Sequence, residues 1–274
     1  MRPTLDVDLF GDPLPAAPLK PILKYAGGKT WQVPHVRPLW TPHAHRRFVE
    51  PFCGGLGMTL GLRPERAVVN DANAHVINLH TWAQRGLVLD DDFTLANDKA
   101  LYTRHRDRFN ALVRRGGQGT REAAALFYYL NRTGYNGLCR FNQQGGFNVP
   151  KGKYKKIPYR RDFTEYAAVF AGWDFTSQDF EGVPLEADDF LYCDPPYDCE
   201  FTAYEPSWRG WRDQVRAAEW LAVLTNQATP RIVELYESLG FALTFLDAPR
   251  RISCTGDRTP APEVLATRNL GTGA

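Results

Sequence analysis

The segment Asp189-Phe190-Leu191-Tyr192-Cys193-Asp194-Pro195-Pro196-Tyr197 predicts both a fold and a site. Its first half reads as a buried strand, and Asp194 follows at the carboxyl end, where open α/β sheets bind their ligands. The two prolines remove two successive backbone donors and stiffen the turn, which leaves the Pro195 carbonyl free to accept a hydrogen bond. Tyr197 adds a flat ring. The segment suits a planar ligand with an amino group, such as a nucleobase, although Asp-Pro-Pro alone also occurs as a plain turn.

The composition is that of a globular protein. The 274 residues allow one large α/β domain or a domain with an inserted module, and 43% of them are hydrophobic. No apolar run reaches the roughly 18 residues of a membrane helix. Residues 1–18 carry prolines and acids without an apolar core, so we expect a loose tail rather than a signal peptide. The five cysteines form no Cys-x-x-Cys pair, which favours a reducing cytoplasm over a zinc site or disulfides.

The small net charge hides a strong asymmetry. Residues 99–161 contain fifteen Lys or Arg and two acids, a net charge of +13. The rest of the chain therefore carries −11, because the total is +2. A basic module on an acidic body is typical of a protein that binds a polyanion. The size of the imbalance favours nucleic acid over a merely solvated basic helix face.

Apolar periodicity predicts an α/β body interrupted by a basic insertion. Strands are expected at residues 47–50, 67–70, 173–176, 190–193 and 222–225, with closing antiparallel strands at 241–247 and 263–266. A short helix is expected to follow Gly57 and to reach Leu62, and further helices are expected at residues 72–85, 101–115, 121–132, 163–170 and 231–239. Residues 138–150, rich in Gly, Asn, Gln and aromatics, predict a hairpin or an extended loop. We divide the chain into a disordered tail (1–18), a catalytic body (19–90 and 165–274) and an inserted module (91–164).

Two glycine segments point to a ligand. Gly54, Gly55 and Gly57 let backbone approach a ligand at a strand–helix junction. Asp71 ends the next strand, where a carboxylate accepts ribose hydroxyls, and its spacing from the loop suits NAD and S-adenosylmethionine equally. No Gly-Lys-Ser/Thr ends the loop, so a Walker P-loop is disfavoured. The second segment, Leu23–Lys29, has two lysines, one on either side of a Gly-Gly turn. It is either a binding site for a carboxylate or phosphate or an ordinary basic loop.

Together these pieces resemble the DNA adenine methyltransferase (Dam) family, in the class with the glycine loop first, the recognition module second and Asp-Pro-Pro-Tyr third. The resemblance covers about residues 20–270. Its most specific part is Asn131–Lys156, which is similar to the family's recognition hairpin almost residue for residue. The other matching segments are Leu23–Lys29, with Tyr25 where many members have Trp, and Phe48–Gly57, Asn70–Asn73, Phe201–Tyr204 and Arg251–Ser253.

The resemblance implies a class I S-adenosylmethionine-dependent methyltransferase fold: a Rossmann-like mixed sheet with an inserted, mainly helical target-recognition module that contains a hairpin. It implies methyl transfer from S-adenosylmethionine to the amino nitrogen (N6) of adenine in duplex DNA. By motif position, the residues expected at the cofactor are Tyr25, Lys29, Phe52, Gly54, Gly55, Asp71 and Asp194. The expected catalytic residues are Asp194, Pro195, Pro196 and Tyr197.

Members with this recognition hairpin commonly read GATC. The residues then expected at DNA are Lys24, Asn136, Leu138, Arg140, Pro150, Tyr154 and Lys155. Arginine can donate two bonds to guanine, leucine and proline can pack on a thymine methyl, and lysines suit phosphates. The resemblance also implies a monomer in the cytoplasm of a bacterium or phage-infected cell, associated with the nucleoid, without a metal or a membrane. Whether a restriction enzyme accompanies it is open.

The implied mechanism is direct transfer. The adenine has to leave the stack, at a cost of a few kcal/mol that stacking on Tyr197 offsets in part. Its amino group would donate to the Asp194 carboxylate and the Pro195 carbonyl, which aims the nitrogen lone pair at the methyl carbon for an in-line displacement.

Four alternative functions make different demands on the sequence. A carbon-5 cytosine enzyme needs a nucleophilic cysteine after proline, and no Pro-Cys occurs. An amino-cytosine or RNA methyltransferase is disfavoured by Asp at position 194 and by the recognition segment. A nicotinamide oxidoreductase leaves the basic module unexplained. A catalytically impaired DNA-binding homologue stays open, because the stretch between Tyr204 and Ala222 is short, which predicts a short helix and a weakened sheet edge.

Overall fold

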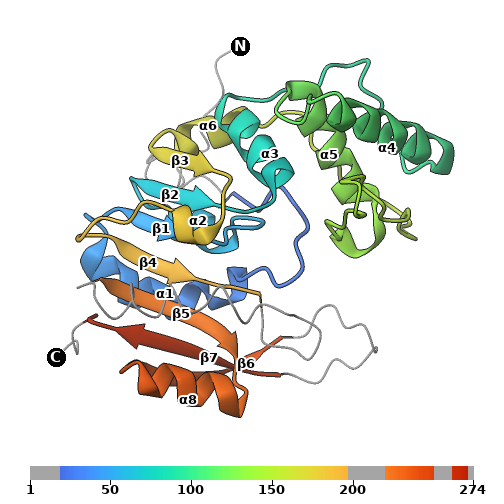
Figure 1. Cartoon of the computed structure of the whole chain (residues 1–274). Coiled ribbons are helices and arrows are strands. Elements are labelled where there is room, and N and C mark those ends of the chain that lie inside the picture. Colours follow the sequence, from blue (N-terminus) through green and yellow to red (C-terminus); the bar gives the residue numbers. More distant parts are fainter. Residues whose placement is uncertain (1–18, 197–219, 250–260, 271–274) are drawn as a thin grey trace, which may run out of the picture.

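A computed structural model describes residues 19–196, 220–249 and 261–270 of the chain (Figure 1). Within them, one seven-stranded sheet has the order β3-β2-β1-β4-β5-β7-β6. The strands are β1 Phe48–Glu50, β2 Ala67–Asn70, β3 Trp173–Thr176, β4 Phe190–Cys193, β5 Leu221–Gln227, β6 Ala242–Ala248 and β7 Ala261–Arg268. The first five are parallel, and β7 runs antiparallel to both β5 and β6. This is the mixed sheet that the sequence predicted, including its two closing strands.

The order of the strands creates a place for a ligand. From β1 the chain moves to β2 and β3 on one side, and it returns to β4 on the other side of β1. Connections therefore lead away in opposite directions at the carboxyl ends of β1 and β4. Such switch points leave a crevice in open α/β sheets.

The central strands are apolar because both faces of the sheet are covered. All four residues of β2 and of β4 are buried. Alternate residues enter two different cores: Phe190 and Tyr192 join the larger one, and Leu191 and Cys193 join the smaller one. A parallel strand covered on both faces reads as a continuous apolar run, which is how residues 190–193 were recognised. Cys193 is buried and points into the body.

Side chains cap the starts of four of the described α-helices, α3, α4, α5 and α8. The longer ones are α1 Val33–Trp40, α2 Gly57–Leu62, α3 Ala74–Gln84, α4 Lys99–Arg114, α5 Arg121–Thr133, α6 Thr164–Phe170 and α8 Pro230–Ser238. Short 3₁₀ turns are η1 Thr30–Gln32, η2 Thr41–His43, η3 Tyr135–Gly137 and η4 Phe180–Gly182. Asn73, Asp98 and Thr120 accept hydrogen bonds from the first turns of α3, α4 and α5, a contact worth about 1 kcal/mol at a helix start. These caps place the starts within two residues of the predictions.

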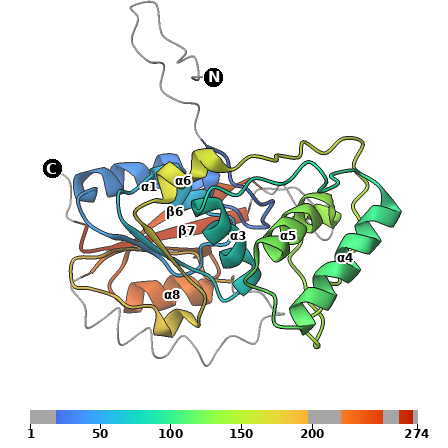
Figure 2. The same ribbon diagram turned by 90° about the horizontal axis from the view of Figure 1, so that it is seen from above.

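The basic insertion leaves and rejoins the body at one point. Val88 and Asp162 form an isolated antiparallel bridge, and Leu89 N–H donates to the Arg161 carbonyl at 2.8 Å. Between these stems, α4 and α5 lie to one side of the sheet, beyond α3 (Figures 1 and 2). Phe127 of α5 and Leu79 of α3 belong to the same hydrophobic core, so the insertion packs on the body rather than standing apart.

Residues 138–150 form an extended loop rather than a regular two-stranded hairpin. One isolated bridge joins Phe141 to Phe147, and another joins Gly134 to Lys151. Between Phe141 and Phe147, the Asn142 side chain accepts from the backbone N–H groups of Gln144 and Gly146. Side-chain bonding to the local backbone replaces the longer ladder that a hairpin would need.

Several predictions from the sequence lie outside the described residues: the tail 1–18, Tyr197, Phe201–Tyr204, Arg251–Ser253 and nearly all of the short segment before Ala222. In the part of the chain that the structure describes, no helix is long and apolar enough to cross a bilayer. The same part holds no group of three or more His, Cys, Asp or Glu side chains suited to a metal ion.

Candidate active site

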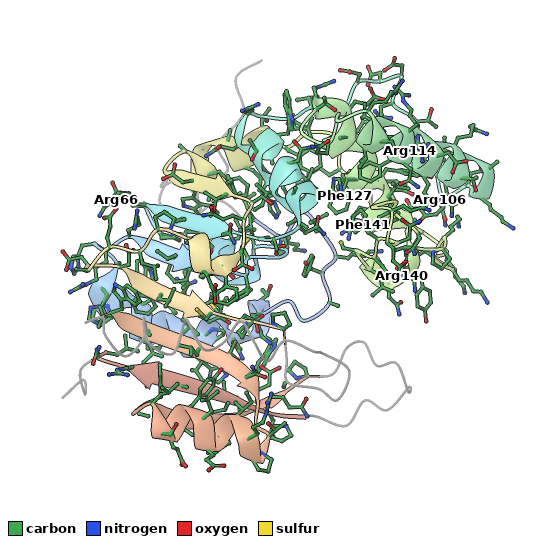
Figure 3. All side chains as sticks on the ribbon, in the orientation of Figure 1. Arg66, Arg106, Arg114, Phe127, Arg140 and Phe141 are labelled. Carbon is green, nitrogen blue, oxygen red and sulfur yellow. The ribbon has the colours of Figure 1, made fainter. Side chains whose placement is uncertain are left out.

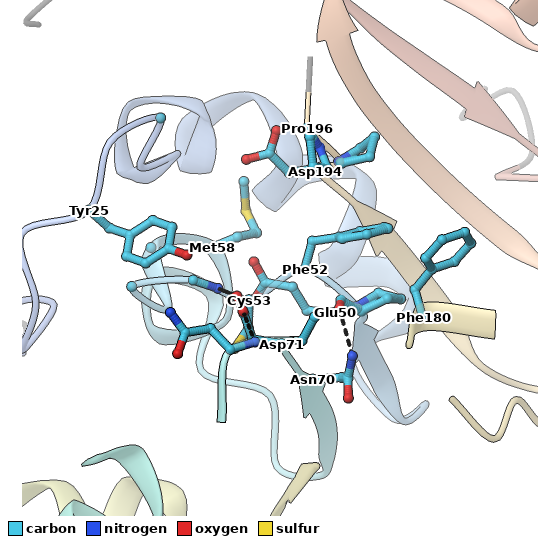
Figure 4. Close-up of a pocket in the computed structure, with 18 of the residues that line it drawn as sticks. Tyr25, Glu50, Phe52, Cys53, Met58, Asn70, Asp71, Phe180, Asp194 and Pro196 are labelled. Carbon is cyan, nitrogen blue, oxygen red and sulfur yellow. Dashed lines mark hydrogen bonds between the residues drawn. The ribbon is translucent and has the colours of Figure 1, made fainter. Parts of the chain in front are cut away.

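A cavity of about 560 Å³ opens at the carboxyl ends of β1, β2 and β4 (Figure 4). Its walls come from segments within residues 25–29, 50–58, 70–73, 178–180 and 194–196. Figure 4 shows Asp194 and Pro196 on one side of the cavity and Asp71 on the other. The two carboxylates that the sequence singled out thus face one space, although they lie far apart in the chain.

The glycine loop lies under the ring of Tyr25. Gly54 has φ +44°, a conformation that favours glycine. A Cβ at Gly54 would be 2.7 Å from the Tyr25 ring, and one at Gly55 would be 3.0 Å from Tyr25 Cβ. The absence of both side chains lets Tyr25 cover the loop and form part of the cavity wall.

Asp71 is held by backbone donors from both sides. Its Oδ2 accepts from Gly54 N–H at 2.9 Å, and its Oδ1 accepts from Asn73 N–H at 2.8 Å. Burial raises the pKa of this carboxyl group, and the two backbone donors oppose that shift. Each oxygen keeps a further acceptor position, so the group is oriented and still able to accept hydroxyl donors from a ligand.

Asp194 meets a buried ammonium group. Lys29, only 4% exposed, places its Nζ 3.2 Å from Asp194 Oδ1 and 3.3 Å from a carboxylate oxygen of Glu263. Burial raises the pKa of Asp194 to about 7, Lys29 lowers it through charge and hydrogen bonding, and the Glu263 charge raises it. Asp194 therefore ionises near neutral pH. Sequence reasoning placed two lysines around the Gly-Gly turn, but the carboxylates that Lys29 holds are the protein's own.

Glu50 is a second buried acid in the cavity wall. It is 3% exposed and accepts from the Thr59 backbone N–H at 3.2 Å and from the Thr59 hydroxyl. Burial raises its pKa to about 8, against the opposing effect of these two donors. Glu50 is therefore mostly protonated at neutral pH, unlike a solvated glutamate.

The residues predicted at the cofactor all line this cavity: Tyr25, Lys29, Phe52, Gly54, Gly55, Asp71 and Asp194. Pro195 and Pro196 line it too. Phe52 packs its ring on Phe180 with 5.2 Å between the centroids. Tyr197, the fourth predicted catalytic residue, lies outside the described residues.

The residues predicted at DNA gather on the extended loop and the segments beside it. Arg140 and Lys155 are exposed, as is Pro150, whereas Leu138 and Asn136 are half-buried. Arg140 donates through Nε to Asn148 Oδ1 at 2.8 Å, so its guanidinium is held on the outside of the loop (Figure 3).

Lys24 and Tyr154 make contacts within the protein. Lys24 Nζ donates to the Arg132 carbonyl at 3.0 Å and lies 3.7 Å from the centre of the Tyr154 ring. The Tyr154 hydroxyl donates to the Gly134 carbonyl at 3.1 Å. To contact DNA, either side chain would have to give up these contacts within the protein or make the DNA contact in addition to them.

Residues 25–246 match the family of D12 class N6 adenine-specific DNA methyltransferases. The chain belongs to this family. A DNA N-6-adenine-methyltransferase of Escherichia phage P1 is 33% identical over 271 residues, which cover 89% of this chain and 35% of that protein. A retron Ec67 DNA adenine methylase of Escherichia coli is 32% identical, with 89% of this chain and 90% of the relative covered. A type II methyltransferase of Lactococcus lactis subsp. cremoris is 31% identical, with 91% and 95% covered.

The protein is thus an adenine-specific DNA methyltransferase, and the family and fold predicted from its motifs are confirmed. Because the family acts on adenine in DNA, the amino-cytosine and RNA alternatives are disfavoured. The cavity at the switch point and the basic insertion are the two features of the described residues that bear on its function.

Sequence reasoning missed several residues that shape the methyltransferase site: Glu50, Asn131, Gln32 and Glu263. Asn131 is fully buried; its Oδ1 accepts from Lys24 N–H at 2.9 Å, and its Nδ2 donates to the Lys24 and Gly137 carbonyls. It ties the segment before Tyr25 to the start of the extended loop, residues 138–150. The available signal was a polar residue inside an apolar run, as in Tyr129-Leu130-Asn131 and Glu263-Val264-Leu265.

Proposed function

We propose that the enzyme transfers a methyl group from S-adenosylmethionine to N6 of the adenine in GATC, with the adenine flipped out of duplex DNA. One observation supports this most directly: Asp194 and Pro195 share a cavity with Asp71 and the glycine loop. The first pair suits an exocyclic amine, and the second pair suits an adenosine ribose. A methyl donor and its acceptor have to meet in this way.

The residues of the cavity fit the proposed donor. Asp71 offers two oriented oxygens for the ribose hydroxyls, and Gly54 and Gly55 leave room for close approach of a ligand to the backbone. Tyr25 and Phe52 supply aromatic surface in the same wall. Bound S-adenosylmethionine would supply an electrophilic methyl carbon on a sulfonium.

Asp194 and Pro195 would orient the acceptor. An amine that donates one N–H to the Asp194 carboxylate and the other to the Pro195 carbonyl has its lone pair directed away from both. Pro196 stiffens this turn, and Tyr197 is the proposed stacking surface for the flipped base. Lys29 keeps Asp194 charged and in place. The enzyme then acts by positioning and electrostatics, without a covalent enzyme intermediate.

The inserted module is the proposed reader of GATC. Arg140 would donate to guanine, Leu138 and Pro150 would pack on a thymine methyl, and Lys155 would hold a phosphate. Tyr154, Asn136 and Lys24 complete the proposed contacts. We propose that residues 91–164 form this module and that the enzyme acts as a cytoplasmic monomer near the nucleoid. Light scattering of the free and DNA-bound protein would test the oligomeric state.

Asp194→Ala tests the catalytic assignment. We expect the rate of methyl transfer to fall by about 1,000-fold, the order of the loss when one group that stabilises the transition state electrostatically is removed. The affinity for duplex DNA should stay within about threefold of the wild-type value. Transfer of labelled methyl to a GATC duplex and a fluorescence binding assay measure the two quantities. Asp188→Ala, which removes an exposed carboxylate before the same strand, serves as the matched control. Undiminished turnover in Asp194→Ala would refute the assignment.

The target sequence is tested in cells. DNA from cells that express the enzyme should carry N6-methyladenine at GATC, and DNA from cells that express Asp194→Ala should not. Methyladenine confined to another sequence would overturn the GATC assignment and leave the catalytic one standing. Calorimetry with S-adenosylmethionine tests the proposed methyl donor, since a protein that binds duplex but not this compound would overturn that assignment.

A further inference from the structure

Lys29 belongs to a buried polar cluster built by four parts of the chain. We define the Lys29 cluster as Lys29, Gln32, Tyr192, Asp194, Thr225 and Glu263, which come from η1 and the residue before it, from β4 and the turn after it, from β5 and from β7. Lys29 Nζ lies 3.2 Å from Asp194 and 3.3 Å from each oxygen of Glu263. The ammonium therefore sits between two carboxylates.

Neutral groups fix Glu263 in this arrangement. Gln32 Nε2 donates to Glu263 Oε2 at 2.7 Å and to Thr225 Oγ1 at 2.9 Å. The Tyr192 hydroxyl donates to Gln32 Oε1 at 2.9 Å, so the amide has one orientation. Gln32, Tyr192 and Thr225 are fully buried, and Glu263 is 5% exposed. A carboxylate held this tightly, on a strand far along the chain from Asp194, serves the site rather than the surface.

The charges of the cluster do not balance. Among the described side chains that meet there, one ammonium faces two carboxyl groups, which leaves a net charge of −1 whenever Asp194 is ionised. A buried ion pair already costs desolvation energy, and a second carboxylate adds to that cost. A fold optimised for stability alone would not place Glu263 there. Asp194, whose pKa is raised by burial, lies in this cleft, and such a group is more typical of a functional site.

We infer that Glu263 is a positioning residue for methyl transfer: it holds Lys29 against Asp194 and leaves a net negative charge beside the reacting amine. This inference rests on the proposed function, because it needs Asp194 to bind the amine.

The reaction supplies a reason for that charge. The nitrogen lone pair forms the N–C bond while the C–S electron pair moves onto sulfur, so positive charge passes from sulfur to nitrogen. One N–H proton then leaves along its hydrogen bond to Asp194. A fixed negative charge favours both the arriving cation and the proton acceptor, without any reorganisation at the moment of reaction.

Glu263 also affects the ionisation of Asp194. Its charge raises the pKa of Asp194, whereas Lys29 lowers it, and burial is the largest cause of the rise to about 7. The other described titratable groups that interact with Asp194 are Glu50, Cys193 and Tyr236. Burial raises the pKa of each of these three, so all are mostly neutral at pH 7. Removal of Glu263's charge should therefore act on Asp194 in one direction.

The test is the pH dependence of single-turnover methyl transfer by the full chain, with saturating S-adenosylmethionine and GATC duplex. In Glu263→Gln we expect the apparent pKa of the acid limb to fall by about one unit, because a carboxylate within reach of the same ammonium no longer repels Asp194. The plateau rate should fall about tenfold. Glu263→Asp keeps the charge and should keep the wild-type apparent pKa. Glu237→Gln, an exposed acid on α8, is the matched control.

The outcomes separate the two proposals. A Glu263→Gln profile that coincides with wild type while Asp194→Ala is inactive refutes the role of Glu263 alone. A lower rate with an unchanged apparent pKa also refutes it, because a merely structural defect would look that way. Should Glu263→Gln fail to fold in thermal unfolding, Gln32→Met removes one donor to Glu263 without removing a charge. It must then slow transfer and change the apparent pKa of the acid limb, and a wild-type rate or an unchanged apparent pKa there refutes the inference. An active Asp194→Ala refutes the proposed function and this inference with it.

Discussion

Glu50 and Asp194 are buried acids in one cavity with different surroundings. Asp194 has a cation 3.2 Å away, whereas Glu50 has the backbone N–H and hydroxyl donors of Thr59. Burial raises both pKa values, that of Glu50 to about 8 and that of Asp194 to about 7. The Thr59 donors oppose the rise at Glu50, and the Lys29 ammonium opposes it at Asp194.

The stability of the enzyme should depend on Glu50 in a defined pH range. The folded-state pKa, about 8, lies above the ordinary value of 4.5, so the stabilising contribution is complete below pH 4.5 and lost as pH rises to about 8. In Glu50→Gln the side chain does not ionise, so this loss of stability with rising pH is absent. The free energy of unfolding of Glu50→Gln minus that of wild type should therefore be greater at pH 8.5 than at pH 5 by ~2–4 kcal/mol. Urea unfolding at both pH values measures this, and an equal difference at the two would contradict it.

Residues of the site were predictable where their position in a local pattern carried the signal. Asp194 and Asp71 follow apolar strands, and Gly54 follows a strand and precedes a helix, so each could be placed at the ligand edge of the sheet. Glu263 and Asn131 could not, because their partners lie 234 and 107 residues away. Such pairings depend on the register of the fold, which a single sequence does not display.

At the level of elements, the role of the glycine loop in cofactor binding can be tested by comparing Gly54→Ala with Gly145→Ala, since both glycines have positive φ. In Gly54→Ala, a methyl group would meet the Tyr25 ring at 2.7 Å and the residue would keep φ near +44°. We expect a loss of at least about 1 kcal/mol of stability from the backbone alone and a further loss of cofactor affinity, about tenfold or more, as Tyr25 is displaced. Calorimetry with S-adenosylmethionine measures the affinity.

Gly145→Ala is the control for that experiment. Gly145 has φ +74°, and a Cβ there meets nothing within 4 Å. It should lose similar stability through strain and bind the cofactor as wild type does. Equal cofactor affinity in the two variants would show that the close contact of Gly54 with Tyr25 has no part in binding.

The helices and strands were largely predictable because apolar periodicity and capping residues act locally. The conformation of the extended loop, residues 138–150, was harder to predict. Asn110 of α4 accepts from Phe147 N–H at 2.8 Å and donates to the Phe147 carbonyl at 3.1 Å, and the Tyr102 hydroxyl donates to the Val149 carbonyl. Partners on α4 thus satisfy the backbone that a regular hairpin would pair across its own strands. Tertiary contacts, rather than the sequence of the loop itself, determine its conformation.

The whole molecule separates acidic and basic halves in space. Residues 99–161, which carry a net charge of +13, lie between stems that meet at Val88 and Asp162, so this charge is confined to one side of the fold (Figures 2 and 3). The charge pattern was visible in the sequence. The strand order that sets the module beside the cavity depends on pairings between strands such as β1 and β4, which lie far apart in the chain, and no local pattern reports them.

This arrangement predicts that phosphate contact and sequence reading can be separated by mutation. Lys155→Ala should weaken binding to GATC and to unrelated duplex alike and reduce the slope of log affinity against log salt by about one, as one fewer phosphate is neutralised. Arg140→Ala should cost GATC binding about 1–3 kcal/mol and leave unrelated duplex nearly unaffected by comparison. Asn148→Ala, which removes the side-chain acceptor of Arg140 Nε, should fall between wild type and Arg140→Ala. Fluorescence binding at several salt concentrations measures all three.

Arg66→Ala is the control for charge alone, because Arg66 lies on the body, away from the module that carries Arg140 (Figure 3). It removes one positive charge, as Lys155→Ala does, and should change neither slope nor preference. If Arg66→Ala weakens duplex binding as much as Lys155→Ala, the net charge of the protein governs binding and the basic module has no special place in it. If Arg140→Ala keeps the wild-type preference for GATC, the extended loop is not what reads the sequence.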